Sequence, residues 1–258
     1  MMKLLKVGAA LTAMSLAGTT ASHAVVTQLG FAIDESGSIF SSDFVLQKDG
    51  LAAALANNLP TNGDFEVTVV SFSSGIETVV APTVIDSAAT LQSVVDLITA
   101  NTQSSGLTNL GGALNTLTSL ITGSANFAGA SEQIINISTD GVPTTGPDAV
   151  SEAIAAFGAG IDIISAEAVG SFDLATLQAV VDPFDMVDDD QVLVELGLGE
   201  TIPDNQPFIV AVDSFADFGA AIDAKIEVLV GPEPVPAPAT LALLGLGLIG
   251  VSAARRRR

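Results

Sequence analysis

The chain contains no cysteine, no tryptophan and no tyrosine, and its one histidine, His23, lies near the N-terminus. Without cysteine no disulfide can brace the fold, so stability has to come from a hydrophobic core, with bound metal as a further source. Beyond residue 24 the chain also offers no imidazole, thiol or phenol. These absences exclude a Ser-His-Asp triad, a cysteine nucleophile and histidine-ligated zinc, and we expect a protein that is not an enzyme.

Basic residues are also scarce, with 8 lysines and arginines against 29 acidic residues and a net charge of −21. Lys3, Lys6 and the arginines at 255–258 stand in the terminal segments. Only Lys48 and Lys225 lie between them, against all 29 acidic residues, so this interior carries a net charge of −27. Such a charge repels phosphate and excludes nucleic-acid binding. The acidic residues suit contact with divalent cations outside the cell, or serve solubility alone.

The N-terminal segment, residues 1–24, has the pattern of a secretory signal peptide. Lys3 and Lys6 precede a mostly apolar stretch at 7–17, and Ser22 and Ala24 place small side chains where a signal peptidase reads. About 200 residues follow, enough for one domain with a full core. We predict that this domain spans residues 25–230.

The C-terminal segment begins with a Pro-rich linker at 231–238 and continues with an apolar stretch from residue 239 that ends in four arginines. The apolar stretch is shorter than the roughly 20 residues of a full membrane span. By the positive-inside rule, the arginines should keep the chain end in the cytoplasm. The domain before the tail is then expected to face outward.

This tail, 239–258 with the linker before it, resembles the PEP-CTERM sorting signal of Gram-negative bacteria. Residues 235–241, V-P-A-P-A-T-L, lie where that motif has V-P-E-P-S-T-L, with Ala237 in place of Glu. The resemblance implies recognition by an exosortase and transient association with the inner membrane. The protein would then pass to the cell surface or the extracellular matrix. A permanent tail anchor is the alternative.

Strands and helices alternate along the body of the chain. Strands are predicted at 28–33, 65–71, 78–84, 133–138, 161–166 and 208–212. Helices are predicted at 41–59, 88–99, 109–121, 147–157, 174–181 and 214–229, the first with Phe44, Val45, Leu51, Leu55 and Leu59 on its apolar side. The alternation predicts an α/β fold, a doubly wound, mostly parallel six-stranded sheet with helices on both faces.

Two segments depart from the simple alternation. The strand at 78–84 is expected to be antiparallel, because the turn Ser73-Ser74-Gly75 joins it closely to the strand before it. Residues 182–200 are acidic and irregular, and we interpret them as an insertion with room for a short extra strand. This insertion is either a solvated loop or a second calcium site, although its spacing fits no EF-hand.

The most informative motif is F-A-I-D-E-S-G-S-I at residues 31–39. It places Asp34, Ser36 and Ser38 directly after a predicted buried strand, so that a carboxylate and two hydroxyls can point toward one spot. Hard oxygen donors at such spacing suit Mg²⁺, with Mn²⁺ and Ca²⁺ as alternatives. Thr108 adds a hydroxyl from a loop, and Asp140 adds a carboxylate after another predicted strand. Ligands of such sheets bind outside the carboxyl ends of the strands, so Asp34 and Asp140 are expected to converge.

This combination resembles the metal-ion-dependent adhesion site of the von Willebrand factor A domain, over roughly residues 27–229. The resemblance implies a sheet order of 3-2-1-4-5-6. It also implies that Ser36 and Ser38 are direct metal ligands and that Thr108 ligates directly or through water. Asp34 and Asp140 would balance the charge from a second layer. The metal would hold a carboxylate of a protein or polysaccharide partner.

Two other interpretations of the same residues remain open at this point. Ser36 and Ser38 are also ordinary helix-capping residues, and Asp140 is an ordinary turn residue. Alternatively, a metal is bound and only stabilises the fold of a structural matrix or biofilm component.

Overall fold

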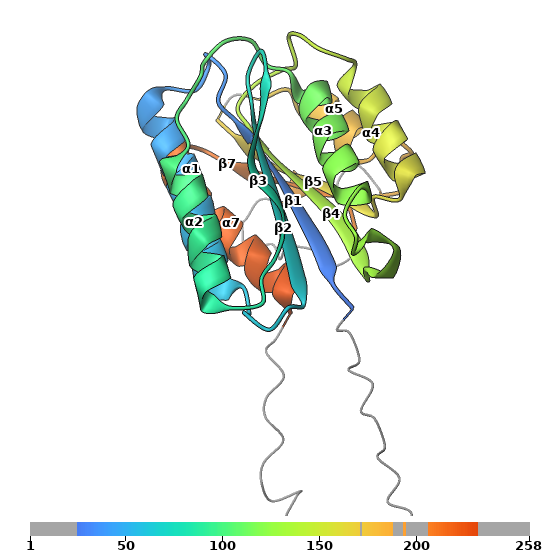
Figure 1. Ribbon diagram of the computed structural model, residues 1–258. Helices are drawn as coiled ribbons and strands as arrows, with labels where there is room; N and C mark the ends of the chain where they lie inside the picture. The colour runs from blue at the N-terminus through green and yellow to red at the C-terminus, as the bar shows by residue number, and fades with distance from the viewer. Residues whose placement is uncertain (1–24, 171, 188–192, 195–205, 232–258) are drawn as a thin grey trace, which may run out of the picture.

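The computed structural model describes residues 25–170, 172–187, 193–194 and 206–231 (Figure 1). The predicted signal peptide, the tail at 239–258 and all but the first residue of the predicted linker lie outside the described residues. None of the helices in the described ranges is both long and apolar enough to cross a membrane.

One sheet runs through the domain in the order β3-β2-β1-β4-β5-β7-β6. Its strands are β1 (Thr27–Asp34), β2 (Phe65–Phe72), β3 (Ile76–Val84), β4 (Glu132–Thr139), β5 (Ile163–Val169), β6 (Leu193–Val194) and β7 (Phe208–Val212). Only β3 is antiparallel, and it pairs with β2. The strands β1, β2, β4 and β5 are buried almost throughout, as expected for parallel strands covered on both faces.

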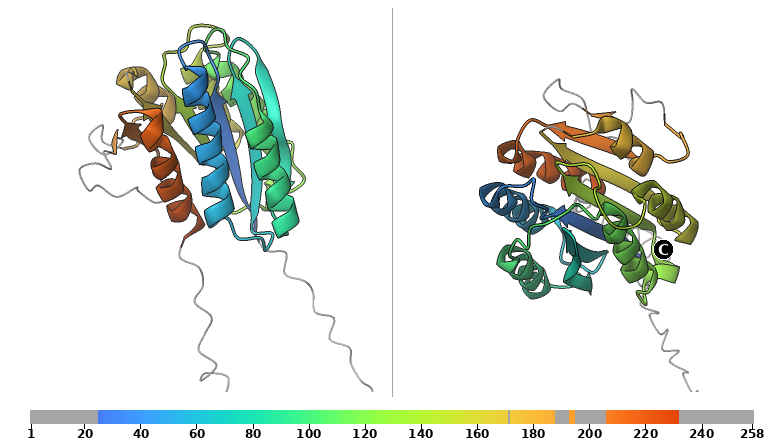
Figure 2. Two further views of the ribbon diagram at one scale, coloured as in Figure 1. Left: turned by 90° about the vertical axis from the view of Figure 1, so that its left-hand side faces the viewer. Right: turned by 90° about the horizontal axis from the view of Figure 1, so that it is seen from above.

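Helices cover both faces of this sheet (Figure 2). The helices are α1 (Ser41–Asn58), α2 (Ala88–Ala100), α3 (Leu110–Thr122), α4 (Ala149–Ala159), α5 (Leu174–Val181) and α7 (Phe215–Val230), with a 3₁₀ turn η1 (Phe127–Gly129). One face packs against α1, α2 and α7, and the other against α3, α4 and α5. The doubly wound α/β prediction is therefore confirmed.

The predicted elements are all present, with ends that differ by a few residues. Helix α4 begins at Ala149 because Asp148 is its N-cap and accepts the N–H of Ser151. Strand β5 begins later than predicted because Gly160 ends α4 in the left-handed conformation, and Ile161 still donates to the carbonyl of Ala156. The two-residue β6 pairs with β7 and is the short extra strand expected in the acidic insertion.

One detail of the first helix was wrong. Val45 was placed on its apolar side, but Val45 is exposed and Gln47 is buried instead. The inward face follows the helical period from Phe44 through Gln47 to Leu51, and Val45 lies off that stripe. The Nε2 of Gln47 donates to the carbonyl of Ser138 in β4 at 3.3 Å, while its buried Oε1 has no hydrogen-bond partner among the described residues.

The two ends of the described domain leave from the same edge of the sheet, at the bottom of Figure 1. Strands β1 and β4 start at that edge and run in parallel to the opposite one. The loops after β1 and β4 therefore lie on the side of the domain away from residue 231, where the predicted linker begins.

Candidate metal centre

Asp34 is the last residue of β1, and its side chain is completely buried. Its Oδ1 accepts the backbone N–H of Ser36 at 2.8 Å, and its Oδ2 accepts the hydroxyl of Thr139 at 2.6 Å. Strands β1 and β4 are neighbours in register, with Ile33 opposite Ser138, so the ends of the two strands meet. The carboxylate is thus held rigidly below the surface, where it orients the loop that follows β1.

The two serines of the motif continue from Asp34 toward the surface. Ser36 is buried and Ser38 is exposed, and their Oγ atoms lie 3.0 Å apart. Ser38 then donates its hydroxyl to Oδ1 of Asp140 at 2.7 Å. A chain of close oxygen contacts therefore links the loop after β1 to the loop after β4.

Thr108 approaches the same place from the loop between α2 and α3. Its side chain is nearly buried, its N–H donates to the hydroxyl of Thr144, and its carbonyl accepts the N–H of Thr144. A Cβ atom added to Gly141 would lie 3.5 Å from Oγ of Ser38 and 3.8 Å from Oγ1 of Thr108. The hydroxyls of Ser38 and Thr108 thus border one small space, which the missing side chain of residue 141 leaves open.

All five residues singled out from the sequence therefore gather at one edge of the sheet. They come from the end of β1 and from the loops after β1, before α3 and after β4. They present two carboxylates and three hydroxyls, namely Asp34, Ser36, Ser38, Thr108 and Asp140. In the described ranges, no group of three or more acidic side chains is arranged to hold a metal ion, so any metal at this centre depends on the hydroxyls.

The glycines around the centre allow its loops to touch each other. The N–H of Gly37 donates to the carbonyl of Gly106 at 2.8 Å, and a Cβ on Gly37 would lie only 3.2 Å from that oxygen. Gly106 has a φ of +123°, and a Cβ there would lie 2.5 Å from Oγ of Ser74. Close contact between loops, together with positive φ at Gly106, requires glycine at these positions.

Several supporting residues escaped the sequence analysis. Glu35 is buried, and it accepts both the hydroxyl of Ser104 at 2.6 Å and its N–H at 3.3 Å. Gln103 donates its amide to the carbonyl of Ile39 at 2.9 Å. These bonds tie the loop after β1 to the loop before α3. Glu35 lies between Asp34 and Ser36 in the chain, and no local pattern distinguished it from a solvent-facing acid. Thr139, which donates to Asp34, also supports the centre. Its place directly before Asp140 at the strand end was the one feature of the sequence that could have indicated this role.

Burial controls the charge of these acids. Burial raises the pKa of Asp34 to about 6, against the hydrogen bonds from Thr139 and Ser36, which lower it. The pKa of Asp140 is also raised, chiefly by burial, while the hydrogen bond from Ser38 opposes the rise. Burial likewise raises the pKa of Glu35.

Among the described residues, no basic side chain offsets these charges. Lys225, one of two lysines between residues 7 and 254, pairs with Glu167 at 2.9 Å. Lys48, the other, donates to the carbonyls of Thr99 and Asn101. A buried carboxylate with neutral donors alone is costly to ionise. A divalent cation would supply the missing charge, and the oxygen-only donor set fits Mg²⁺ and similar ions.

The acidic insertion begins with an aspartate whose hydrogen bonds stay within its own loop. Asp182 is turned into its own loop, where its carboxylate accepts the N–H groups of Met186 and Val187. The three aspartates at 188–190 lie outside the described residues. A second calcium site in this insertion therefore stays a prediction.

Comparison with known families shows two matches. A family model described as "Protein of unknown function (DUF1194)" matches residues 24–232. The PEP-CTERM protein-sorting motif matches residues 234–258, which bears out the resemblance of the tail. No curated protein matches the chain in sequence.

Solved structures share the fold at low sequence identity. Proximal thread matrix protein 1 from the mussel byssus is similar with a TM-score of 0.61 and 18% identity, over 80% of this chain and 48% of that one. One structure of that protein has a zinc-occupied MIDAS motif. The manganese-loaded TRAP protein of Plasmodium vivax is similar with a TM-score of 0.55 and 17% identity, over 78% of this chain and 72% of the TRAP chain.

The pilus adhesin SpaC from Lactobacillus rhamnosus GG is similar with a TM-score of 0.58 and 13% identity, over 80% of this chain and 30% of the adhesin. The chain spans about half the length of the mussel protein. These likenesses show that the chain has the fold of a von Willebrand factor A domain.

Proposed function

The chain belongs to the DUF1194 family of proteins of unknown function, and we propose that it is an exported protein that recognises a partner through a divalent metal. The metal would be held at the centre formed by the loops after β1, after β4 and before α3. The observation that carries this proposal is the run of oxygen contacts from buried Asp34 through Ser36 and Ser38 to Asp140.

The donor set suggests which side chains would bind the metal directly and which would hold those ligands in place. The hydroxyls of Ser36 and Ser38 would bind the metal directly, and Thr108 would bind directly or through water. Asp34 and Asp140 would hold those hydroxyls and balance the charge, because both carboxylates already accept hydrogen bonds from the loops. Few anionic ligands would touch the metal, which would leave it attractive to a carboxylate from a partner. Mg²⁺ suits this set best, with Mn²⁺ and Ca²⁺ as alternatives.

The position of the centre fits display at a surface. Residue 231 leaves the domain at the edge opposite the loops after β1 and β4 (Figure 1). The PEP-CTERM motif follows directly, so a chain attached through its tail would present the centre away from the attachment point. We propose the division foreseen from the sequence, a leader at 1–24, a binding domain at 25–230, a linker at 231–238 and a sorting tail at 239–258. An exosortase would process this tail.

A binding role, rather than catalysis, is supported by the side chains available at the centre. They are carboxylates and hydroxyls, with no imidazole or thiol in the chain after residue 24 to act as base or nucleophile. Neither lysine of the domain reaches the centre, since both are engaged elsewhere. Phosphoryl transfer would lack the basic residues that position its substrate.

A second function is favoured by the burial of Asp34. Because this carboxylate has no cationic partner in the part of the chain that the structure describes, a metal held nearby would stabilise the native state by itself. The protein would then be a structural component of an extracellular matrix or biofilm, with a metal that serves the fold.

The first experiment is calorimetric titration of Mg²⁺, Mn²⁺ and Ca²⁺ into the purified full-length protein. Ser38→Ala and Thr108→Val should abolish saturable binding, while Ser42→Ala, an exposed serine of the same segment, should leave it unchanged. Thermal unfolding of the same variants separates the two functions. A large stabilisation by metal without any metal-dependent partner favours the structural role, and a wild-type protein that binds no metal contradicts both.

A further inference from the structure

We propose that Phe40, Leu107 and Val142 form an apolar rim around the metal centre. This rim would dock a protein segment in which one acidic residue is flanked by apolar residues. The inference rests on the proposed function and adds the class of partner. The three side chains are 74%, 53% and 45% exposed, although each is large and apolar.

The rim is defined by its closeness to the candidate ligands. Phe40 follows Ser38 by two residues, Leu107 directly precedes Thr108, and Val142 follows Asp140 by two residues. Consecutive Cα atoms lie about 3.8 Å apart, so each rim residue is within about 8 Å of its ligand along the backbone. Since the ligands converge, the three exposed apolar residues lie on the loops that meet at the centre.

Hydrogen bonds hold the backbone at Phe40 and at Leu107. The carbonyl of Phe40 accepts the N–H groups of Asp43 and Phe44 at the start of α1. The N–H of Leu107 donates to Oγ of Ser74 at 2.9 Å. Single apolar residues on a surface are ordinary, but three from separate loops around one polar centre indicate an interaction site. Because the backbone at Phe40 and Leu107 is held by these bonds, less entropy is lost there when a partner binds.

Charge selects a protein segment over an acidic polysaccharide. The interior of the chain carries a net charge of −27, and both of its lysines are engaged away from the centre. The metal would be the one local positive charge, able to hold a single carboxylate. The many further carboxylates of a polyuronate would meet this acidic surface and be repelled. Apolar side chains beside a single acid would instead lose water against the rim.

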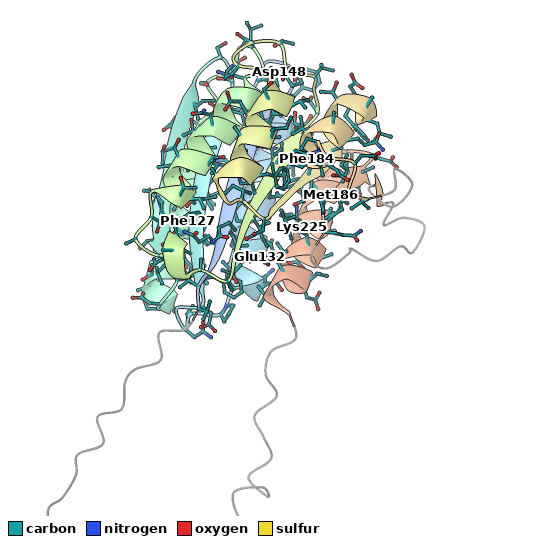
Figure 3. All side chains as sticks on the ribbon, turned by 90° about the vertical axis from the view of Figure 1, so that its right-hand side faces the viewer. Phe127, Glu132, Asp148, Phe184, Met186 and Lys225 are labelled. Atoms are coloured by element: carbon teal, nitrogen blue, oxygen red, sulfur yellow. The ribbon has the colours of Figure 1, made fainter. Side chains whose placement is uncertain are left out.

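A cleft beside the rim gives the partner segment a direction. It has a volume of about 350 Å³ and runs from Val142 along the loop that leads into α4. Its lining includes Thr144, Thr145 and Asp148, and Figure 3 shows Asp148 at the top of the domain, where α4 begins. Because Val142 belongs to both the rim and the cleft, a segment bound at the metal can continue into the cleft. The exposed carboxylate of Asp148 favours a neutral or basic residue there.

The test measures Mg²⁺-dependent binding of three probes to the purified full-length protein. Two are synthetic peptides of equal length and charge with one central glutamate, flanked by leucine and phenylalanine in one and by serine and glycine in the other. The third is alginate, an acidic polysaccharide. We expect the apolar-flanked peptide to bind at least about tenfold more tightly than the polar-flanked one.

Variants then assign the preference to the rim. Phe40→Ser and Leu107→Ser should each weaken binding of the apolar-flanked peptide by about fivefold or more. Matched controls are Leu97→Ser on α2, which is 51% exposed, and Val25→Ser before β1, which is 60% exposed at the opposite edge of the sheet. Both controls should bind the peptide like the wild type.

The outcomes separate this inference from the function on which it rests. If Mg²⁺ binds the wild type and the rim variants alike, but the two peptides bind equally or neither binds, the rim proposal is wrong and the metal centre stands. If alginate binds more tightly than either peptide, the rim proposal is overturned in favour of a polysaccharide partner. If the wild type does not bind Mg²⁺, both proposals fail together.

Discussion

The hydroxyl of Thr139 donates a 2.6 Å hydrogen bond to Oδ2 of Asp34, and both side chains are completely buried. This bond crosses from the end of β4 to the end of β1, and Asp140, the next residue, holds Ser38. The side chains that support the candidate centre thus form one hydrogen-bonded unit, which joins the ends of two neighbouring strands.

Thr139→Val should therefore destabilise this hydrogen-bonded unit. The variant keeps the shape of the side chain but leaves Oδ2 of Asp34 buried without its donor. The free energy of unfolding should fall by about 1–3 kcal/mol. Urea denaturation measures this change, and Thr139→Ser, which restores a hydroxyl, should recover most of it. Equal stability of the valine variant and the wild type would show that this bond contributes nothing.

The stability of the metal-free protein should fall as pH rises from about 4 to about 6. Burial raises the pKa of Asp34 to about 6, so in this window the native state keeps a proton that the unfolded chain has released. The loss amounts to at most about 3 kcal/mol at neutral pH. Urea denaturation across this range with a chelator present measures it, and Asp34→Asn should remove this part of the slope. An unchanged slope in Asp34→Asn contradicts the assignment.

Metal binding should show the opposite pH dependence. A cation at the centre favours the ionised carboxylate of Asp34, so protons and metal compete. Mg²⁺ affinity should therefore decline as pH falls below about 6. Calorimetric titration at pH 5 and pH 7 checks this expectation. Equal affinity at both values would place Asp34 outside the influence of the metal.

Gly141→Val should block the centre without unfolding the domain. The new side chain would enter the space bordered by the hydroxyls of Ser38 and Thr108. Gly141 does not have a positive φ, so valine is sterically permitted by the backbone. Mg²⁺ affinity should drop by at least about tenfold. Gly129→Val is the control, because a Cβ there meets no atom within 4 Å. Unchanged metal affinity in Gly141→Val would move the metal elsewhere.

Lys225→Met should destabilise the domain strongly. Lys225 and Glu167 are both fully buried between α7 and β5, and Asn136 donates a further hydrogen bond to Glu167 at 2.6 Å. Burial lowers the pKa of Lys225, against the charge of Glu167. Removal of the lysine leaves a buried carboxylate without its cation, at a cost of about 3–5 kcal/mol. Thermal unfolding measures the loss, and Lys225→Met with Glu167→Gln should regain a large part. No recovery in the double variant would contradict this account.

The sequence alone predicted the order of strands and helices, the doubly wound sheet and the five residues of the candidate centre. Strand and helix periods are local properties, and Asp34, Ser36 and Ser38 are close in the chain. Asp140 was placed beside Asp34 by the rule that parallel strands end at one edge of the sheet, and Thr108 was placed by the resemblance to the metal-ion-dependent adhesion site. The order of the elements and the convergence of the two aspartates thus required only short-range patterns and topology.

Only the tertiary structure decided which residues support the centre and what surrounds it. Glu35 and Lys225 look like surface charges in the sequence, and their burial follows from partners that are 69 and 58 residues away. The contact of Gly37 with Gly106 likewise joins loops that are distant in the chain. Local periodicity carries no information about such pairs, because their energies appear only when the strand order brings the loops together.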